Sequence, residues 1–442
     1  YEGVPDNLKE GRFPTREELD HAAPEHPVYI RAIWGHWRNT LPLVSVASSM
    51  ALARAGITRD TVPPAPSIEI GKDPATGEPN GVLTEHTYKP LVEKTLMSCI
   101  PRFTLDDRTR GLRRSMQIYN SYGTTSVFEG HGIASEVLAA YQALRVEGPL
   151  PVRSHLVFSP AWPTTDITVI RDLLTDWGRW LARRGMGDDY LRMSGLYTES
   201  EYNIENRLRA MCGPYTGWAG FNFDCALPED VMIELMAEAA RLGIRCGSFG
   251  PQTLDHFERA SKLAPIAGQR WILEHVGIFS KDDIARIRDL GLVLQAYSSK
   301  WIEDDGEALL DRLGEARCEQ VLPMRDLIDA GIHVSLATDN VPPTLFAAIG
   351  HVVARRTDKG RRIGPGQAVS REEALAAASR EGAYLTFEED EKGTIEPGKL
   401  ADLAVLGEDL LTAPEERITG IAADITVTGG RIVFARNGGD AT

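Results

Sequence analysis

The stretch that decides the fold runs from Trp271-Ile-Leu-Glu-His275 to Ser335-Leu-Ala-Thr-Asp339. Each end is a short apolar run that stops at a polar side chain able to bind a metal ion. Between the two ends, the sequence predicts a helix over 281–290, a strand over 292–295 and a second helix over 323–330. This βαβαβ order indicates a parallel sheet. Because the strands of a parallel barrel end on one face, we expect His275 and Asp339 to meet there.

The same alternation of strands and helices extends upstream of this stretch. The run Thr124-Thr-Ser-Val-Phe128 is rich in strand-forming residues and leads into Glu129-Gly-His131, which repeats the layout of His275 and Asp339. An eight-stranded barrel that lacks its first strand would give about the number of strand ends that we count, so the predicted fold class is α/β with a TIM-like (β/α)8 barrel. The strand ends are expected near Glu129, Phe158, Ser194, Cys246, His275, Gln295 and Asp339.

Three regions are expected along the chain. Residues 1–104, with a Pro- and Gly-rich segment over 62–83, predict an insertion or lid region packed over a site. Residues 105–390 predict the barrel and its catalytic face. Residues 391–442 predict part of a small β-domain, because Ile425–Phe434 has the pattern of a hairpin with a Gly-Gly turn.

Composition excludes several classes of protein. The 442 residues carry 48 Lys and Arg against 63 Asp and Glu, and a net charge of -15 repels nucleic acid and anionic membranes. No apolar run approaches the length of about 18 residues that spans a bilayer, and no basic-then-apolar signal opens the chain, so we expect a cytoplasmic protein. The five cysteines have no C-x-x-C spacing, which favours reduced thiols.

The C-terminal motif carries a resemblance to a known family. Lys392-Gly-Thr-Ile-Glu-Pro-Gly-Lys-Leu-Ala-Asp402, followed by the hairpin at Thr428-Gly-Gly-Arg-Ile-Val433, resembles the β-sandwich closure of the amidohydrolase superfamily. Pro14–Asp20, Gly35-His36 and Gly77–Leu83 resemble the amidohydrolase-3 branch, which includes N-substituted formamide deformylases and relatives of N-acyl-D-amino-acid deacylases. The resemblance implies a metal-dependent (β/α)8 barrel that hydrolyses amide-like C–N bonds, with a small composite β-sandwich domain made from both chain ends.

Three departures from the family pattern affect the expected metal site. The family places a His-x-His pair at the end of the first barrel strand, and this sequence contains no such pair. We expect the pair to lie upstream of Tyr1, together with the first barrel strand. Arg192 or Met193 stands where the family has a carboxylated lysine, and Gly247 stands where it has a histidine. A standard two-metal site is therefore not expected.

Four residues are the candidate metal ligands: His131, Glu129, His275 and Asp339. The resemblance places His131 where a thiolate ligand occurs in D-aminoacylase relatives, and imidazole is a good ligand for Zn²⁺. Each of these residues also has a structural interpretation. A histidine can be a buried hydrogen-bonding residue, and Asp339 can cap a helix. Glu129 and His131 can belong to a turn. Cys246 is a further soft ligand, unless strand alternation turns it into the core.

The predicted chemistry is metal-assisted hydrolysis. A divalent metal, most simply zinc as one or two ions, would lower the pKa of a bound water to about 7. Asp339 and His275 are the predicted catalytic residues, with Asp339 as general acid and base. His36 and Trp301 are predicted to contact the substrate, although either can be structural.

Other functions stay open at this point. A catalytically lapsed or metal-free barrel would act as a binding or regulatory protein, and a lyase or isomerase could use the same scaffold. The expected partner is a small-molecule substrate, with no nucleic acid and no membrane, and a homodimer is an open arrangement.

Overall fold

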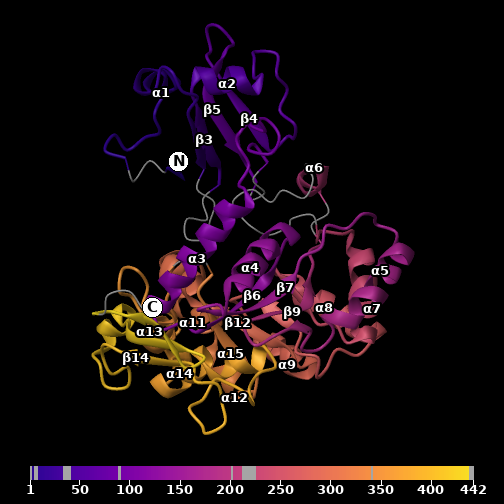
Figure 1. Cartoon of the computed structure of the whole chain (residues 1–442), viewed down its shortest axis with the longest axis vertical. Helices are drawn as coiled ribbons and strands as arrows, with labels where there is room; N and C mark the ends of the chain where they lie inside the picture. The colour runs from indigo at the N-terminus through magenta and orange to yellow at the C-terminus, as the bar shows by residue number, and fades with distance from the viewer. Residues whose placement is uncertain are drawn as a thin grey trace. The chain divides into compact units, whose positions relative to one another are not determined.

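The computed structural model describes residues 2–3, 8–32, 41–87, 91–200, 203–211, 225–339 and 342–437. The chain divides into two compact units. One unit contains residues 1–103 and 202–219, and the other contains residues 104–201 and 220–442 (Figure 1). The second unit includes all the strand ends that the sequence predicted.

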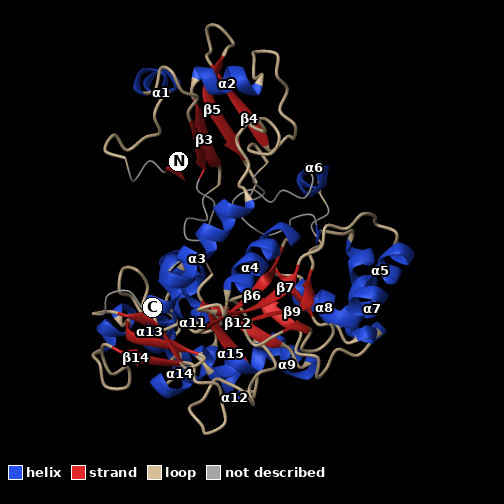
Figure 2. Ribbon diagram, in the orientation of Figure 1, coloured by secondary structure: helices blue, strands red, loops and turns tan. Residues whose placement is uncertain are grey.

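A curved sheet of seven parallel strands, which form the wall of a TIM-like barrel, organises the second unit (Figure 2). The predicted fold class is confirmed, because each predicted strand end lies in one of these strands or directly after it. The short strand β8 (Met186–Gly187) pairs antiparallel with β9 outside this path. The strand order is β13 (Val334–Ala337), β12 (Val293–Tyr297), β11 (Ile272–Glu274), β10 (Cys246–Phe249), β9 (Leu191–Tyr197), β7 (Arg153–Phe158) and β6 (Ser126–Ile133).

Helices connect successive strands of this sheet. The helix α9 illustrates why they form where they do, since Ser280 and Asp283 make a capping box at its start and Gly291 ends it with a φ of 65°. Residues 371–385 form two helices instead of one, because Ser379 departs from helical geometry. The helices are α3 (Leu105–Ser121), α4 (Ser135–Glu147), α5 (Ile167–Leu181), α7 (Glu229–Leu242), α8 (Thr253–Leu263), α9 (Lys281–Leu290), α10 (Gly306–Leu313), α11 (Glu315–Cys318), α12 (Met324–Asp329), α13 (Leu345–Ala354), α14 (Arg371–Ala378) and α15 (Arg380–Leu385).

Two faces of the parallel sheet have different surroundings. The outward face packs on the helices and forms the main core, which includes Trp271, Phe257 and Cys246. Cys246 is therefore a core residue, as strand alternation predicted, and the reading of it as a metal ligand is wrong. The inward face carries a smaller apolar cluster that includes Val157 and Tyr197, and the polar residues of the candidate site lie on this side.

The first unit is built on a five-stranded sheet in the order β1 (Glu2–Gly3), β2 (Tyr29–Ala32), β3 (Leu43–Ala47), β5 (Pro79–Glu85) and β4 (Ile68–Lys72), with the helices α1 (Arg16–Ala22), α2 (Ser49–Ala55) and α6 (Ile204–Met211). The Pro- and Gly-rich composition of 62–83 did not predict strands, yet β4 and β5 pair antiparallel there. The Asp73 side chain accepts hydrogen bonds from the backbone of Ala75 and Thr76. These hydrogen bonds stabilise the turn between β4 and β5. The lid role of this region stays a prediction.

A three-stranded sheet completes the second unit. The strands β14 (Leu403–Leu406), β15 (Ala423–Thr428) and β16 (Arg431–Ala435) pair antiparallel, so the predicted hairpin is confirmed. Across the described part of the chain, no helix combines the length and the apolar character that crossing a bilayer requires.

Candidate metal centre

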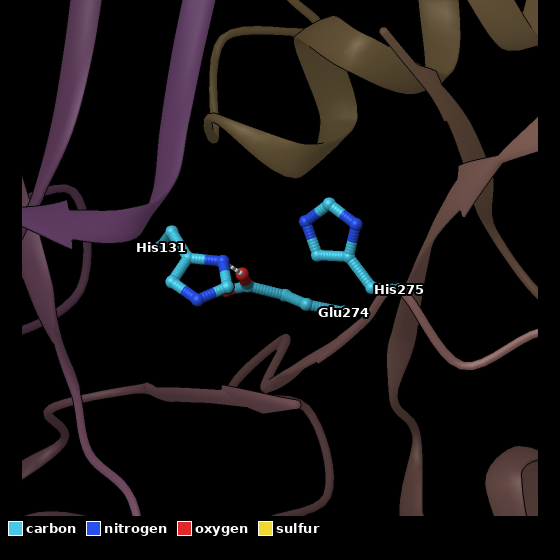
Figure 3. Close-up of side chains that lie close together, drawn as sticks. All are labelled: His131, Glu274 and His275. Atoms are coloured by element: carbon cyan, nitrogen blue, oxygen red, sulfur yellow. Dashed lines mark ion pairs between the residues drawn. The ribbon is translucent and has the colours of Figure 1, made fainter. Parts of the chain in front are cut away.

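Three side chains meet at the carboxyl ends of two strands. His131 lies near the end of β6, Glu274 ends β11, and His275 follows it directly. One possible ligand atom from each of them lies within 4.8 Å of the others. The His131 Nδ1 atom is 3.7 Å from Glu274 Oε2, and the two imidazole centroids are 5.4 Å apart. Figure 3 shows the Glu274 carboxylate beside the His131 ring, with the His275 ring close to both.

The backbone is unusual where two of the predicted site residues lie. His275 has a φ of 56° and Asp339 has a φ of 51°, so both residues adopt the left-handed conformation. Few residues other than glycine adopt it, and such strain gathers at functional sites. At His275, the indole of Trp301 donates a hydrogen bond of 2.9 Å to the backbone carbonyl. Trp301 belongs to the π-helical turn Ser299–Asp304, which therefore supports the His275 turn.

Glu274 is the most informative residue of the group. Its side chain is completely buried, and within the described ranges neither carboxylate oxygen has a hydrogen-bond partner. Burial, followed by the negative charges of Glu129 and Asp339, raises the pKa of Glu274 well above its usual range. A buried carboxylate without a hydrogen-bond partner costs free energy, which a bound cation would offset. Two imidazoles and this carboxylate therefore fit a divalent metal ion.

The Glu274 carboxylate occupies space that is available because two neighbouring residues are glycines. A Cβ atom on Gly247 would lie 2.5 Å from Glu274 Oε1, and one on Gly130 would lie 3.1 Å from the same oxygen. The sequence singled out Gly247 as the loss of a family ligand. In the structure, the carboxylate of Glu274 fills the space beside this glycine.

Glu129 and Asp339 lie outside the group of three but near it. Their ligand atoms do not join the cluster within 4.8 Å. The surrounding protein and the negative charge of Asp339 raise the pKa of Glu129 to about 7. The Glu129 side chain is exposed, so solvent screens part of this effect. Both carboxylates act electrostatically on Glu274, which indicates that they face the same region of the barrel.

The other predicted residues have separate positions. His36 lies outside the described residues, and the contact of Trp301 with a substrate stays a prediction. The Arg192 Nε atom lies 4.0 Å from Glu388 Oε1, within a buried polar group on the inner side of the sheet. Arg192, at the position that the sequence compared with the family's lysine, therefore pairs with a carboxylate.

Sequence reasoning missed three residues of this region: Glu274, Tyr197 and Glu199. The signal for Glu274 was present, because a carboxylate interrupts the apolar run Trp271–Leu273 directly before a candidate ligand. The Tyr197 hydroxyl lies 2.9 Å from His131 Nε2 and 3.0 Å from Glu199 Oε1. No spacing rule connects these residues to His131, because they lie on β9 and on the loop after it.

Comparison with known proteins places the chain in a family. The model of the amidohydrolase family described as Amidohydro_3 matches residues 4–434. The chain belongs to this family. The N-substituted formamide deformylase of Arthrobacter pascens is 26% identical over 98% of this chain and 78% of its own length. The putative amidohydrolase YtcJ of Bacillus subtilis is 22% identical over 96% of this chain and 77% of its own.

A solved structure supports the fold of this amidohydrolase family member. An uncharacterized metal-dependent hydrolase from Pyrococcus horikoshii superposes with a TM-score of 0.64 and 20% identity, over 94% of this chain and 78% of that one. The chain is thus a hydrolase by family, with a barrel fold and a cluster of ligands that fits a divalent metal.

Proposed function

We propose that this amidohydrolase-family member hydrolyses an amide-like C–N bond of a small non-peptide molecule, with a divalent cation held by His131, Glu274 and His275. The observation that carries the proposal is the buried Glu274 carboxylate, which has no hydrogen-bond partner among the described residues and lies in one cluster with two imidazoles. The similarity to a formamide deformylase supports an acyl amide as the substrate class. Family membership favours hydrolysis over the binding-protein and lyase alternatives.

Zinc is the metal that we propose for this site. Two histidines and one glutamate are a common set for catalytic zinc, which keeps a fourth position for water or substrate. Three ligands in one cluster favour a single ion over a pair. When bound, such an ion supplies a water whose pKa is near neutral and polarises the carbonyl of the substrate.

The residues of the chain would then handle the protons. Water adds to the carbonyl carbon, and the Asp339 carboxylate accepts the proton that this water loses. The C–N bond breaks as Asp339 returns that proton to the leaving nitrogen, so the products are a carboxylic acid and an amine. Glu129 adds its negative charge to the same region, where it acts on Glu274.

Metal analysis with product analysis tests the proposal. Elemental analysis of the purified protein is expected to find about one equivalent of metal, which His131→Ala and His275→Ala lose. His333→Ala is the matched control, because His333 binds Glu381 instead, at 2.6 Å. An amine and a carboxylic acid formed in equal amounts from a small amide would support hydrolysis. A wild-type protein that binds no metal, or products without a carboxylic acid, would overturn the proposal.

A further inference from the structure

A buried hydrogen-bonded chain leads from β9 to His131. Tyr197 ends β9 and its side chain is completely buried, and Glu199 follows two residues later and is also buried. The Tyr197 oxygen lies 3.0 Å from Glu199 Oε1 on one side and 2.9 Å from His131 Nε2 on the other. None of the reaction steps proposed above uses Tyr197 or Glu199.

The direction of each hydrogen bond follows from the chemistry of the three groups. A phenol has one proton to donate, and a carboxylate can only accept. Tyr197 therefore donates its proton to Glu199, and its oxygen accepts from His131. His131 then carries a proton on Nε2, and in the neutral form of the ring the Nδ1 atom presents a lone pair.

In this tautomer the unprotonated Nδ1 atom faces the proposed metal site. Nδ1 is the ring atom on the side of Glu274, 3.7 Å from Oε2. This separation is too long for a hydrogen bond. It is close to the spacing of about 3.3 Å between two ligand atoms of one tetrahedral zinc ion. The ring is also held by aromatic neighbours, since its centroid is 4.6 Å from that of Tyr197 and 4.8 Å from that of Phe249.

We propose that Tyr197 and Glu199 are positioning residues that hold His131 as the Nε2–H tautomer, so that Nδ1 is the atom that binds the metal ion. The part that concerns the metal rests on the proposed function, whereas the tautomer is a property of the metal-free protein. A histidine ligand whose second nitrogen is held in this way gains metal affinity, and loss of the partner typically costs 10–100-fold.

Nitrogen NMR of the metal-free protein tests the tautomer. With ¹⁵N-labelled histidine at a pH of about 8, where an ordinary histidine is neutral, we expect His131 to be protonated at Nε2 in the wild type. In Tyr197→Phe the ring is expected to populate both tautomers. The His131→Gln spectrum assigns the signals. Tyr384→Phe is the control, since Tyr384 stacks on His333.

Zinc affinity of the same variants tests the consequence. Tyr197→Phe is expected to weaken zinc binding by about 10–100-fold, while the thermal unfolding of the metal-free variant stays close to that of the wild type. Glu199→Gln is expected to lose less, because its amide oxygen can still accept from Tyr197. An unchanged tautomer or an unchanged zinc affinity in Tyr197→Phe would overturn the inference. A wild type that binds no zinc but holds the Nε2–H tautomer would overturn the proposed function and the metal part of the inference, and would leave the tautomer assignment standing.

Discussion

Glu274 is a buried acid at the end of an apolar strand, and it is a proposed metal ligand. We predict that Glu274→Gln lowers zinc affinity by more than about 100-fold. The amide keeps the shape of the side chain but removes the charge that a cation needs. Competition with a chromophoric chelator measures the affinity. Glu416→Gln, at an exposed position, is the control, and equal affinities in the two variants would exclude Glu274 as a ligand.

Gly247 tests whether the space beside Glu274 matters. We predict that Gly247→Ala weakens zinc binding by about 10-fold or more, because the new Cβ atom would lie 2.5 Å from Glu274 Oε1 and must displace the carboxylate. Zinc titration of the purified variant measures this loss. Gly420→Ala adds the same methyl group where no atom lies within 4 Å, so it is expected to bind zinc normally. Normal binding by Gly247→Ala would show that the carboxylate can move without loss.

A variant of Asp339 distinguishes a role in proton transfer from a role in metal binding. We predict that Asp339→Asn lowers kcat by about 10²–10⁴-fold and retains its metal. Asparagine tolerates the left-handed conformation that Asp339 adopts at a φ of 51°, so the fold should be kept. Steady-state kinetics and metal analysis of one preparation measure both effects. Loss of the metal would assign Asp339 to the ligands, and full activity would remove it from the mechanism.

At the level of elements, the inner side of the sheet carries a second polar group, which joins β7, β9 and the residue before β10. His155 Nε2 lies 2.7 Å from the Ser194 hydroxyl, and Arg245 Nη2 lies 3.1 Å from that hydroxyl and 3.2 Å from His155 Nε2. The Arg245 guanidinium also lies 5.1 Å from the ring centroid of Phe128 and 4.9 Å from that of Phe387. Burial, with the positive charge of Arg245 beside it, lowers the pKa of His155 well below its usual range.

This polar group gives the protein a pH-dependent stability. The unfolded chain protonates His155 near its ordinary pKa of about 6.5, and the folded protein does so only at lower pH. The unfolded state thus binds more protons in that window, so stability is full above it and falls as the pH drops, by up to about 1.4 kcal/mol per unit for one group. We predict that His155→Gln flattens the fall of Tm between pH 6.5 and pH 5, as scanning calorimetry would measure.

A histidine elsewhere supplies the control for this pH dependence. His21 lies in the exposed last turn of α1. The variant His21→Gln is therefore expected to keep the wild-type slope of Tm against pH. If His155→Gln also kept that slope, another buried group would have to cause the acid sensitivity.

The elements show which features of the fold could be predicted from the sequence. Short strand-like runs that alternate with helices predicted all seven parallel strands, and three of these runs end in the polar residues Glu129, His275 and Asp339. The strands β4 and β5 were missed, since their turn residues dominate the composition of 62–83. The partners of His131 were also missed, because contacts between β6 and β9 depend on tertiary packing.

For the whole molecule, the three-stranded C-terminal sheet is anchored to the barrel by contacts that no local pattern reveals. The Thr426 hydroxyl donates to the Asn120 carbonyl at 2.6 Å, and the Thr428 hydroxyl donates to the Pro151 carbonyl at 2.9 Å. The two pairs are separated by 306 and 277 residues along the chain. The hairpin itself was predictable from its Gly-Gly turn, whereas its attachment was not.

A buried ion pair also connects the barrel to the C-terminal sheet. Arg153 of β7 donates from Nε to Asp402 Oδ2 at 2.6 Å and from Nη2 to Oδ1 at 3.1 Å. Asp402 Oδ1 also accepts from the Gly429 backbone at 2.7 Å. The pair therefore ties β7 to the start of β14 and to the hairpin turn.

We predict that Asp402→Ala destabilises the protein by about 3–5 kcal/mol, because it leaves the Arg153 charge buried without its partner. Denaturant unfolding measures this loss of stability. Asp424→Ala is the matched control, since Asp424 pairs with Arg436 at 2.9 Å on the surface, where such a pair contributes about 0–1 kcal/mol. The double variant Arg153→Met/Asp402→Leu should regain part of the loss, because no buried charge remains unpaired. Equal losses for Asp402→Ala and Asp424→Ala would mean that the attachment of the C-terminal sheet does not depend on this pair.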